Sequence, residues 1–551
     1  MHKFIYGLLL IPIISSCQQS GNKETGTRES SGSKTEKSEL EKKISKRDFS
    51  ITAANAYNDI FLDSTAMEVF IAGNKVNDSV TRRMRSFYNA RNYQYAWFSR
   101  DGLTEQARSF WNLQSYYTSA AKNNDEDNKA LAVLMDRLEL AENLTVTPEN
   151  KEIQKAEFLL TENFIQYILN NYEEGVVKRK ELERFIPLTK TDPLKMADSL
   201  LTKKHKDGKY YEDGNPAYKA LKGQLQKYYT IATTGGWPVV SPAVTKFKPG
   251  SSSPEILKLK LRLLATGEMP ADSTPVFTPA LDAGIKAYQT SRGLTPDGKI
   301  TEGLVKDMNV SVTQRIEQLL INMDRMRWMP ESEGNLLLVN IPAFTLKVFE
   351  GQKVVHEMKV VVGKEGHNTM MFKGDLNQIV FSPYWNVTPD IVKEEIMPAM
   401  SRDPGYLAKH NMEITSNSGG VPVVRQLPGP ENSLGKVKFL FPNSFNIYFH
   451  DTPAKSLFSK DKRAYSHGCI RLSEPAWLAE YLLRNMPAWN PERINEAMNS
   501  GKENFVKLDK AVPVIITYYT AWVDESGVLN FRDDIYANDA HLATKMFVAA
   551  N

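Results

Sequence analysis

The stretch "FHDTPAKSLFSKDKRAYSHGCIRL" (449–472) begins like a strand and ends on a turn that sets a histidine and a glycine directly before a cysteine. Successive side chains of a strand point to opposite faces of its sheet. Ile447 and Phe449 are therefore expected to face an apolar core. Tyr448 and His450 are expected on the opposite face of the strand. The pattern predicts a half-buried strand that presents His450.

Cys469 and His450 are the candidate catalytic pair. A thiol with an ordinary pKa of about 8.5 is mostly protonated at neutral pH, so a cysteine nucleophile needs a neighbouring base. The loop 451–465 is long enough to return Cys469 to the side of His450, the preferred base, with His467 as the competing one. Gly468 lets the chain turn sharply and bring backbone N–H groups close to a reacting carbonyl, as an oxyanion hole requires.

Three further interpretations of this region stay open. Arg471 suits either a substrate carboxylate or a structural ion pair. His450, Asp451, His467 and Cys469 carry zinc-binding groups, although their spacing matches no closed structural pattern. The basic side chains near the motif form either a solvated loop or an attraction for carboxylates; they are Lys455, Lys460, Lys462, Arg463 and Arg471.

His450, the loop and the run "SHGCIR" (466–471) resemble the catalytic motif of the L,D-transpeptidases, the cysteine enzymes that cross-link peptidoglycan. Further stretches resemble the large periplasmic subtype of that family: "VNIPAFTLKVFE", "MKVVVGK", "FSPYWNVTP", "LGKVKFLFPN", "IYFHDTPAKSLF" and "TYYTAWVDESGVLNFRDDIY". That subtype has a helical scaffold, a peptidoglycan-binding-like domain and a lid inserted in the catalytic domain. The resemblance covers about 97–536 and is strongest from Ile316 onward.

The resemblance implies a two-step acyl transfer with no metal or organic cofactor. Cys469 would attack the third residue of a tetrapeptide stem and release D-alanine, and an amine of a second stem would resolve the thioester to a 3-3 cross-link. Peptidoglycan stems would be donor and acceptor, and carbapenem-type β-lactams would acylate the thiol. The residues implied in holding the oxyanion or the substrate are Gly468, His467, Ser466, Arg471, Tyr448 and Trp385. For Tyr448 and Trp385, the alternative is that they only pack as ordinary side chains in the wall of the substrate pocket.

The expected fold class is α+β with several domains, because 551 residues exceed what one hydrophobic core usually organises. Apolar residues recur at helical spacing over 48–250, as in Leu131, Met135 and Leu138, which predicts an all-α scaffold domain. Within that range, the Gly-, Pro- and Ser-rich stretch from residue 233 onward indicates a linker or an irregular crossing.

Two domains are expected after the scaffold. Residues 251–312 are similar to the small helical peptidoglycan-binding domain of cell-wall enzymes, through an amphipathic helix around Tyr288 and a turn at 296–298. Residues 313–551 alternate like strands and predict a mostly β L,D-transpeptidase catalytic domain. Its helical and loop-rich insertion at about 390–437 is expected to be a lid.

The N-terminus predicts export. "MHKFIYGLLLIPIISSC" (1–17) has a basic residue, an apolar run and small residues before a cysteine, and its last four residues resemble a bacterial lipobox. Cys17 is therefore the expected lipidation site, with an ordinary signal peptide and a chance cysteine as the alternative. Residues 18–47 are polar and predict a disordered tether. The expected location is the periplasmic face of the envelope, lipid-anchored to a membrane.

Overall charge does not indicate nucleic acid as a partner. Lys and Arg number 69 and Asp and Glu 65, so the formal net charge is only +4 over 551 residues. The protein partners of the scaffold are not predicted by any motif.

Rival functions share the same residues. Water in place of the acceptor amine would make the protein an L,D-carboxypeptidase, and the same thioester would also serve to attach a protein to the wall. A different class is a murein-anchoring lipoprotein without turnover, which the tether and the binding-like domain favour and the pair Cys469 and His450 does not.

Overall fold

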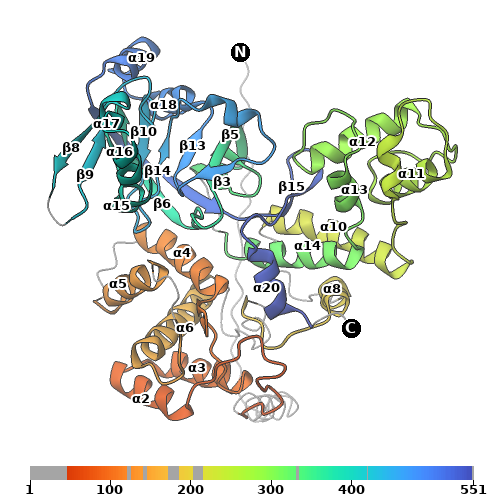
Figure 1. Ribbon diagram of the computed structural model, residues 1–551. Helices are drawn as coiled ribbons and strands as arrows, with labels where there is room; N and C mark the ends of the chain where they lie inside the picture. The colour runs from red at the N-terminus through yellow and green to blue at the C-terminus, as the bar shows by residue number, and fades with distance from the viewer. Residues whose placement is uncertain are drawn as a thin grey trace, which may run out of the picture. The chain divides into compact units, whose positions relative to one another are not determined.

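The structure is a computed structural model that describes residues 46–120, 126–140, 145–171, 185–202, 215–329, 334–417 and 420–548 (Figure 1). The predicted signal peptide, its lipid site Cys17 and nearly all of the predicted tether lie outside these residues. Over the described ranges, no helix combines the length and the apolar character that crossing a bilayer requires.

The N-terminal part of the described chain is helical, as predicted. Its helices are α2 (Ser64–Asn74), α3 (Asp78–Ala90), α4 (Glu105–Ala120), α5 (Glu126–Leu140) and α6 (Lys151–Asn171), and a short hairpin joins β1 (Phe98–Ser99) to β2 (Gly102–Leu103). Leu131, Met135 and Leu138 are buried along α5, which confirms the spacing argument. Their core is rich in aromatic rings, including the fully buried Trp97.

A second helical core is assembled from distant parts of the chain. It contains side chains of α8 (Pro193–Thr202), α10 (Pro216–Thr233), α14 (Val312–Met326) and α20 (Asn538–Met546), together with the hairpin of β15 (Ala521–Val523) and β16 (Leu529–Phe531). A capping box of Ser311 and Gln314 fixes the start of α14. Helix α20 thus shares a core with helices that end before residue 330.

A small helical unit follows α10. It consists of the 3₁₀ helix η1 (Pro242–Lys246), α11 (Pro254–Thr266), α12 (Pro279–Ser291) and α13 (Glu302–Met308) around one apolar core. Val240 and Val244 are fully buried in that core, although they belong to the stretch expected as a linker. Their apolar side chains explain why this stretch packs as part of the unit.

One nine-stranded sheet carries the catalytic motif. Its strands are β3 (Asn335–Asn340), β4 (Thr345–Glu350), β5 (Lys353–Gly363), β6 (Lys373–Phe381), β10 (Val437–Leu440), β11 (Phe449–His450), β12 (Ala464–Ser466), β13 (Ile470–Leu472) and β14 (Asn504–Thr517), in the order β12-β5-β13-β11-β10-β6-β14-β3-β4. The strand β4 also pairs with β5, so the order closes on itself. Helices α18 (Pro475–Leu483) and α19 (Pro491–Asn499) contribute to its core.

The insertion between β6 and β10 folds around its own core. It contains β7 (Trp385–Asn386), α15 (Pro389–Ile391), the π-helix η2 (Val392–Ile396), α16 (Met397–Arg402), α17 (Tyr406–Lys409), β8 (Met412–Ser416) and β9 (Val423–Gln426). The three strands form a separate sheet, β7-β9-β8, over a small apolar cluster. The sequence predicted helices and loops here; the sheet was missed because its strands are short, with β7 lying well before β8 and β9 in the chain. The predicted lid, about 390–437, overlaps most of this insertion; its role as a lid stays a prediction, and we use the word lid as the name of residues 385–426.

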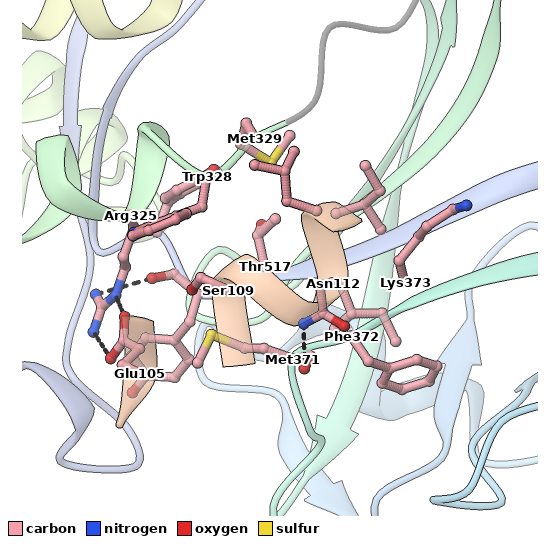
Figure 2. A pocket seen from close by; sticks show the side chains of 15 residues that line it. Glu105, Ser109, Asn112, Arg325, Trp328, Met329, Met371, Phe372, Lys373 and Thr517 are labelled. Atoms are coloured by element: carbon pink, nitrogen blue, oxygen red, sulfur yellow. Dashed lines mark hydrogen bonds and ion pairs between the residues drawn. The ribbon is translucent and has the colours of Figure 1, made fainter. Parts of the chain in front are cut away.

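A shared arginine joins three helices. Arg325 of α14 donates through Nε to Glu105 of α4 at 2.5 Å and through Nη1 to Asp539 of α20 at 2.5 Å. The side chains are 5%, 15% and 12% exposed, so the ions are largely withdrawn from water. Figure 2 shows Glu105 and Arg325 beside a cavity whose described lining residues do not include Cys469 or His450.

We expect Arg325→Leu to lower the free energy of unfolding by about 3–5 kcal/mol, because it leaves two buried carboxylates without a counter-ion. Urea denaturation monitored by tryptophan fluorescence measures the effect. The matched control is Arg85→Ala, whose partner Glu68 and own side chain are 48% and 47% exposed, and which should cost less than about 1 kcal/mol. Equal effects of the two substitutions would contradict the prediction.

Candidate active site

Two parallel strands bring the motif together. In β11 and β13, Phe449 lies opposite Ile470 and His450 lies opposite Arg471. Phe449 and Ile470 are fully buried in the core of the sheet. Because side chains alternate, the neighbours of these two residues point to the other face, where Tyr448, His450 and Arg471 gather with Cys469.

The turn before the nucleophile is held from both sides. Gly468 has a φ of +106°, a conformation that favours glycine. Its carbonyl accepts a hydrogen bond from Thr369 Oγ1 at 2.7 Å, and its N–H donates to Ser466 Oγ at 3.2 Å. The Ser466 hydroxyl in turn donates to the Cys469 carbonyl at 2.5 Å. Ser466 and Gly468 therefore shape the loop that presents the thiol.

Thr369 was not predicted from the sequence, and it anchors this turn to strand β5. Its Oγ1 also accepts from the Gly363 N–H at 2.9 Å. A Cβ on Gly363 would lie 2.0 Å from the carbonyl oxygen of His367, so only glycine fits there. Thr369 lies 100 positions before Cys469, and no local pattern connects the two.

The Cys469 thiol is partly buried. Its Sγ donates to the carbonyl of Asn446 at 3.6 Å. Burial raises the pKa of this thiol to about 11, against opposing contributions from hydrogen bonds with Tyr448 and from the charge of Arg471. The resting sulfur is therefore protonated at neutral pH and requires a base to react.

His450 has the properties of such a base. It is 4% exposed, and its Nδ1 contacts the carbonyl oxygen of Asp451 at 2.5 Å. A carbonyl can only accept, so Nδ1 carries the proton and Nε2 keeps its lone pair. Burial and the charge of Arg471 lower the pKa of His450 to about 3. The imidazole is therefore neutral and able to take a proton.

Cys469 and His450 lie on one face of neighbouring strands. Cys469 is two positions before Arg471, the strand partner of His450, which places the two Cα atoms about 8 Å apart by ordinary strand spacings. Within the described chain the thiol makes no hydrogen bond to the imidazole, since it contacts Asn446 instead.

Arg471 and Tyr448 flank the thiol. Among the residues that the structure describes, the buried Nε atom of Arg471 has no hydrogen-bond partner, and burial lowers the pKa of the guanidinium. A buried unpaired donor of this kind is suited to an oxyanion or a carboxylate of a ligand. The pKa of Tyr448 is raised well above its usual value by burial and by Cys469, so its hydroxyl stays protonated and able to donate.

Trp385 and Arg463 make their contacts inside the protein. Trp385 is partly buried against the apolar cluster of the lid. This environment agrees with the alternative in which Trp385 only packs against neighbouring side chains. Arg463 is 7% exposed and donates to the carbonyls of Val360, Lys460 and Phe344. Its charge is therefore used inside the protein and is not available to attract a soluble carboxylate.

His467 contacts the lid. Its Nε2 lies 2.9 Å from Glu395 Oε1 of η2. Its ring stands edge-on to that of His367, with centroids 4.8 Å apart. The described residues contain no group of three His, Cys, Asp or Glu side chains arranged to hold a metal ion, which leaves the zinc interpretation without a ligand set among them.

Comparison with known proteins identifies the class of this domain. Residues 334–515 match the family model of the L,D-transpeptidase catalytic domain, and residues 82–225 match that of the Scaffold domain. The chain thus contains one region that matches the L,D-transpeptidase catalytic domain and a second that matches the Scaffold domain. The predicted family and the α+β multidomain fold are confirmed.

A Haemophilus influenzae protein whose name assigns it to the L,D-transpeptidases is 32% identical over 242 residues, which are 41% of this chain and 49% of that protein. The chain thus spans about half the length of this curated relative.

Solved structures were also matched. An L,D-transpeptidase from Mycobacterium smegmatis is 17% identical, with 33% of this chain and 58% of that chain covered and a TM-score of 0.19. One from Stackebrandtia nassauensis is 16% identical, with 49% and 95% covered and a TM-score of 0.20. The L,D-transpeptidase LdtMt1 in complex with imipenem is 14% identical, with 34% and 60% covered and a TM-score of 0.18. These scores lie far below 0.5, so the family assignment rests on the sequence matches.

Proposed function

We propose that this protein is a cysteine L,D-transpeptidase that forms 3-3 cross-links between peptidoglycan stem peptides. The observation that carries the proposal is the gathering of Cys469, His450, Tyr448 and Arg471 on one face of two parallel strands. These residues lie within the part of the chain that matches the L,D-transpeptidase catalytic domain.

In the first step His450 Nε2 takes the thiol proton as the sulfur of Cys469 attacks the carbonyl carbon of the third stem residue. The C–N bond to D-alanine then breaks, His450 returns the proton to the leaving amine, and a thioester remains. In the second step an amine of another stem attacks the thioester carbon, which forms the amide and frees the thiol.

The oxyanion of each step would be held by backbone donors of the turn. The N–H groups of Gly468 and Cys469 are the proposed pair. That of Gly468 donates to Ser466 Oγ in the resting structure, so the serine hydroxyl must yield it to the substrate. Arg471 Nε and the Tyr448 hydroxyl are further donors on the same face. One such donor typically lowers the barrier by about 3–4 kcal/mol.

The experiment supplies the purified protein with labelled disaccharide-tetrapeptide and separates the products by liquid chromatography and mass spectrometry. We expect D-alanine release together with tetrapeptide–tripeptide dimers linked between third residues. Trimmed tripeptide without dimers would make the protein an L,D-carboxypeptidase. Label found only on added outer-membrane protein would indicate protein attachment, and an unchanged donor would indicate a murein-anchoring lipoprotein.

We also propose, from the sequence, that the protein is exported and lipidated. The lipobox-like residues 14–17 favour a diacylglycerol on Cys17 and a position at the periplasmic face of a membrane. The helical unit of α11 to α13 is proposed to bind murein, and carbapenem-type β-lactams are proposed to acylate Cys469. The complex of another L,D-transpeptidase with imipenem is consistent with the latter.

A further inference from the structure

The lid touches the catalytic motif through one carboxylate. Glu395 Oε1 lies 2.9 Å from His467 Nε2, with the two side chains 52% and 29% exposed. The flanking residues Val392 and Ile396 of the same π-helical turn are buried in the lid core, which fixes the turn and directs Glu395 outward. Single π-helical turns occur frequently at functional sites.

His467 is close to the reacting sulfur and carries a free lone pair. Only Gly468 separates it from Cys469, so their Cα atoms are within about 7 Å. The contact with Glu395 assigns the proton to Nε2 and leaves Nδ1 as an acceptor. Burial lowers the pKa of His467, the charges of Lys364 and His367 act in the same direction, and Glu395 opposes them. The ring is therefore neutral at neutral pH.

A separate base suits the second half of the reaction. The acceptor is a primary amine that arrives from solvent as an ammonium ion, and an ammonium nitrogen has no lone pair with which to attack. His450 is 4% exposed, whereas the side chains of His467 and Glu395 are 29% and 52% exposed. A partly exposed carboxylate attracts a cation, and a neutral imidazole next to it can take the cation's proton.

We propose that Glu395 of the lid and His467 form the site that binds the ammonium group of the acyl acceptor and deprotonates it for attack on the Cys469 thioester. This inference rests on the proposed transpeptidation. Glu395 contacts the ammonium group, and His467 Nδ1 accepts one proton and passes it to solvent. The free amine forms the C–N bond, the C–S bond breaks, and the second amine proton moves to the departing sulfur. The products are an amide, a thiol and one released proton.

The test compares Glu395→Gln with its neighbour Glu394→Gln in the full chain. Both substitutions remove one exposed carboxylate from the same turn, but only Glu395 contacts His467. Dimer formation is measured against the concentration of a stem peptide that carries a free diamino acid side chain, at fixed disaccharide-tetrapeptide donor. We expect kcat/KM for the acceptor to fall about tenfold in Glu395→Gln, as for the loss of one charge contact near the surface, and to stay at the wild-type value in Glu394→Gln.

A second acyl acceptor, hydroxylamine, distinguishes the proposed ammonium-binding role of Glu395 from a merely structural role. Hydroxylamine is largely uncharged at neutral pH, so it needs neither an ammonium site nor a base. Its rate of thioester cleavage should be the same in Glu395→Gln and in Glu394→Gln. An equal loss with both nucleophiles would mean that Glu395 only positions the lid, and an unchanged acceptor kcat/KM would also overturn the inference. If the wild type itself forms no dimers, transpeptidation is wrong and the acceptor site with it.

Discussion

Cys469→Ala is expected to abolish acylation of the protein by a carbapenem, a loss of at least about 10⁴-fold. The thiol is the atom that forms the covalent bond. Of the nearby hydroxyls, that of Tyr448 is kept protonated by burial and that of Ser466 donates to the Cys469 carbonyl, so neither is expected to replace it. Intact mass spectrometry after incubation with meropenem measures the result. The wild type gains the mass of one inhibitor molecule and the variant gains none.

The substitution should leave the fold intact. The Cys469 thiol donates weakly to Asn446 and interacts with Tyr448, while the turn itself is held by the backbone and by Ser466 and Thr369. The thermal unfolding midpoint of the variant therefore serves as the control. An inhibitor adduct on correctly folded Cys469→Ala would place the nucleophile elsewhere and remove the basis of the proposed chemistry.

His450→Gln is expected to slow acylation about 10²- to 10⁴-fold at neutral pH, the usual contribution of a general base. In the wild type, the pKa of His450 near 3 and that of Cys469 near 11 keep both groups neutral over a wide range. The acylation rate should therefore change little between about pH 6 and 8. The variant lacks the base, so only preformed thiolate reacts, and its rate should rise about tenfold per pH unit below the thiol pKa.

Stopped-flow measurement of carbapenem acylation across this pH range gives both slopes. The comparison with His467→Gln decides between the two candidate bases. A tenfold rise per pH unit in the wild type would show that the imidazole takes no proton from the thiol, and the same rise in His467→Gln alone would make His467 the base of the first step.

Much of the motif was accessible to sequence reasoning because its geometry is local. Strand alternation placed Phe449 in the core and His450 on the opposite face, and the structure confirms both positions. The positive φ of Gly468 also agrees with the expected sharp turn. Such features depend on neighbours within a few residues, which the order of amino acids displays directly.

The residues that were missed act over long separations. Thr369 holds the Gly468 carbonyl from 99 residues away, and Glu395 reaches His467 from 72 residues away. Their placement depends on sheet order and on the packing of the lid, which have no local signature. The same limit applies to the second helical core, where α20 packs on α14, and to Arg463, which donates to the distant carbonyls of Val360 and Phe344.

The lid is built on its own three-stranded sheet and its own apolar cluster. Apart from Glu395, which contacts His467, amino-acid replacement within it is thus expected to act independently of the strands that present the thiol, because additivity holds for sites that share no packing partners. Selection for a different acceptor or for a different degree of water exclusion can therefore change this insertion while the strands that position Cys469 stay the same. Divergence between related wall enzymes is therefore expected to concentrate in residues 385–426.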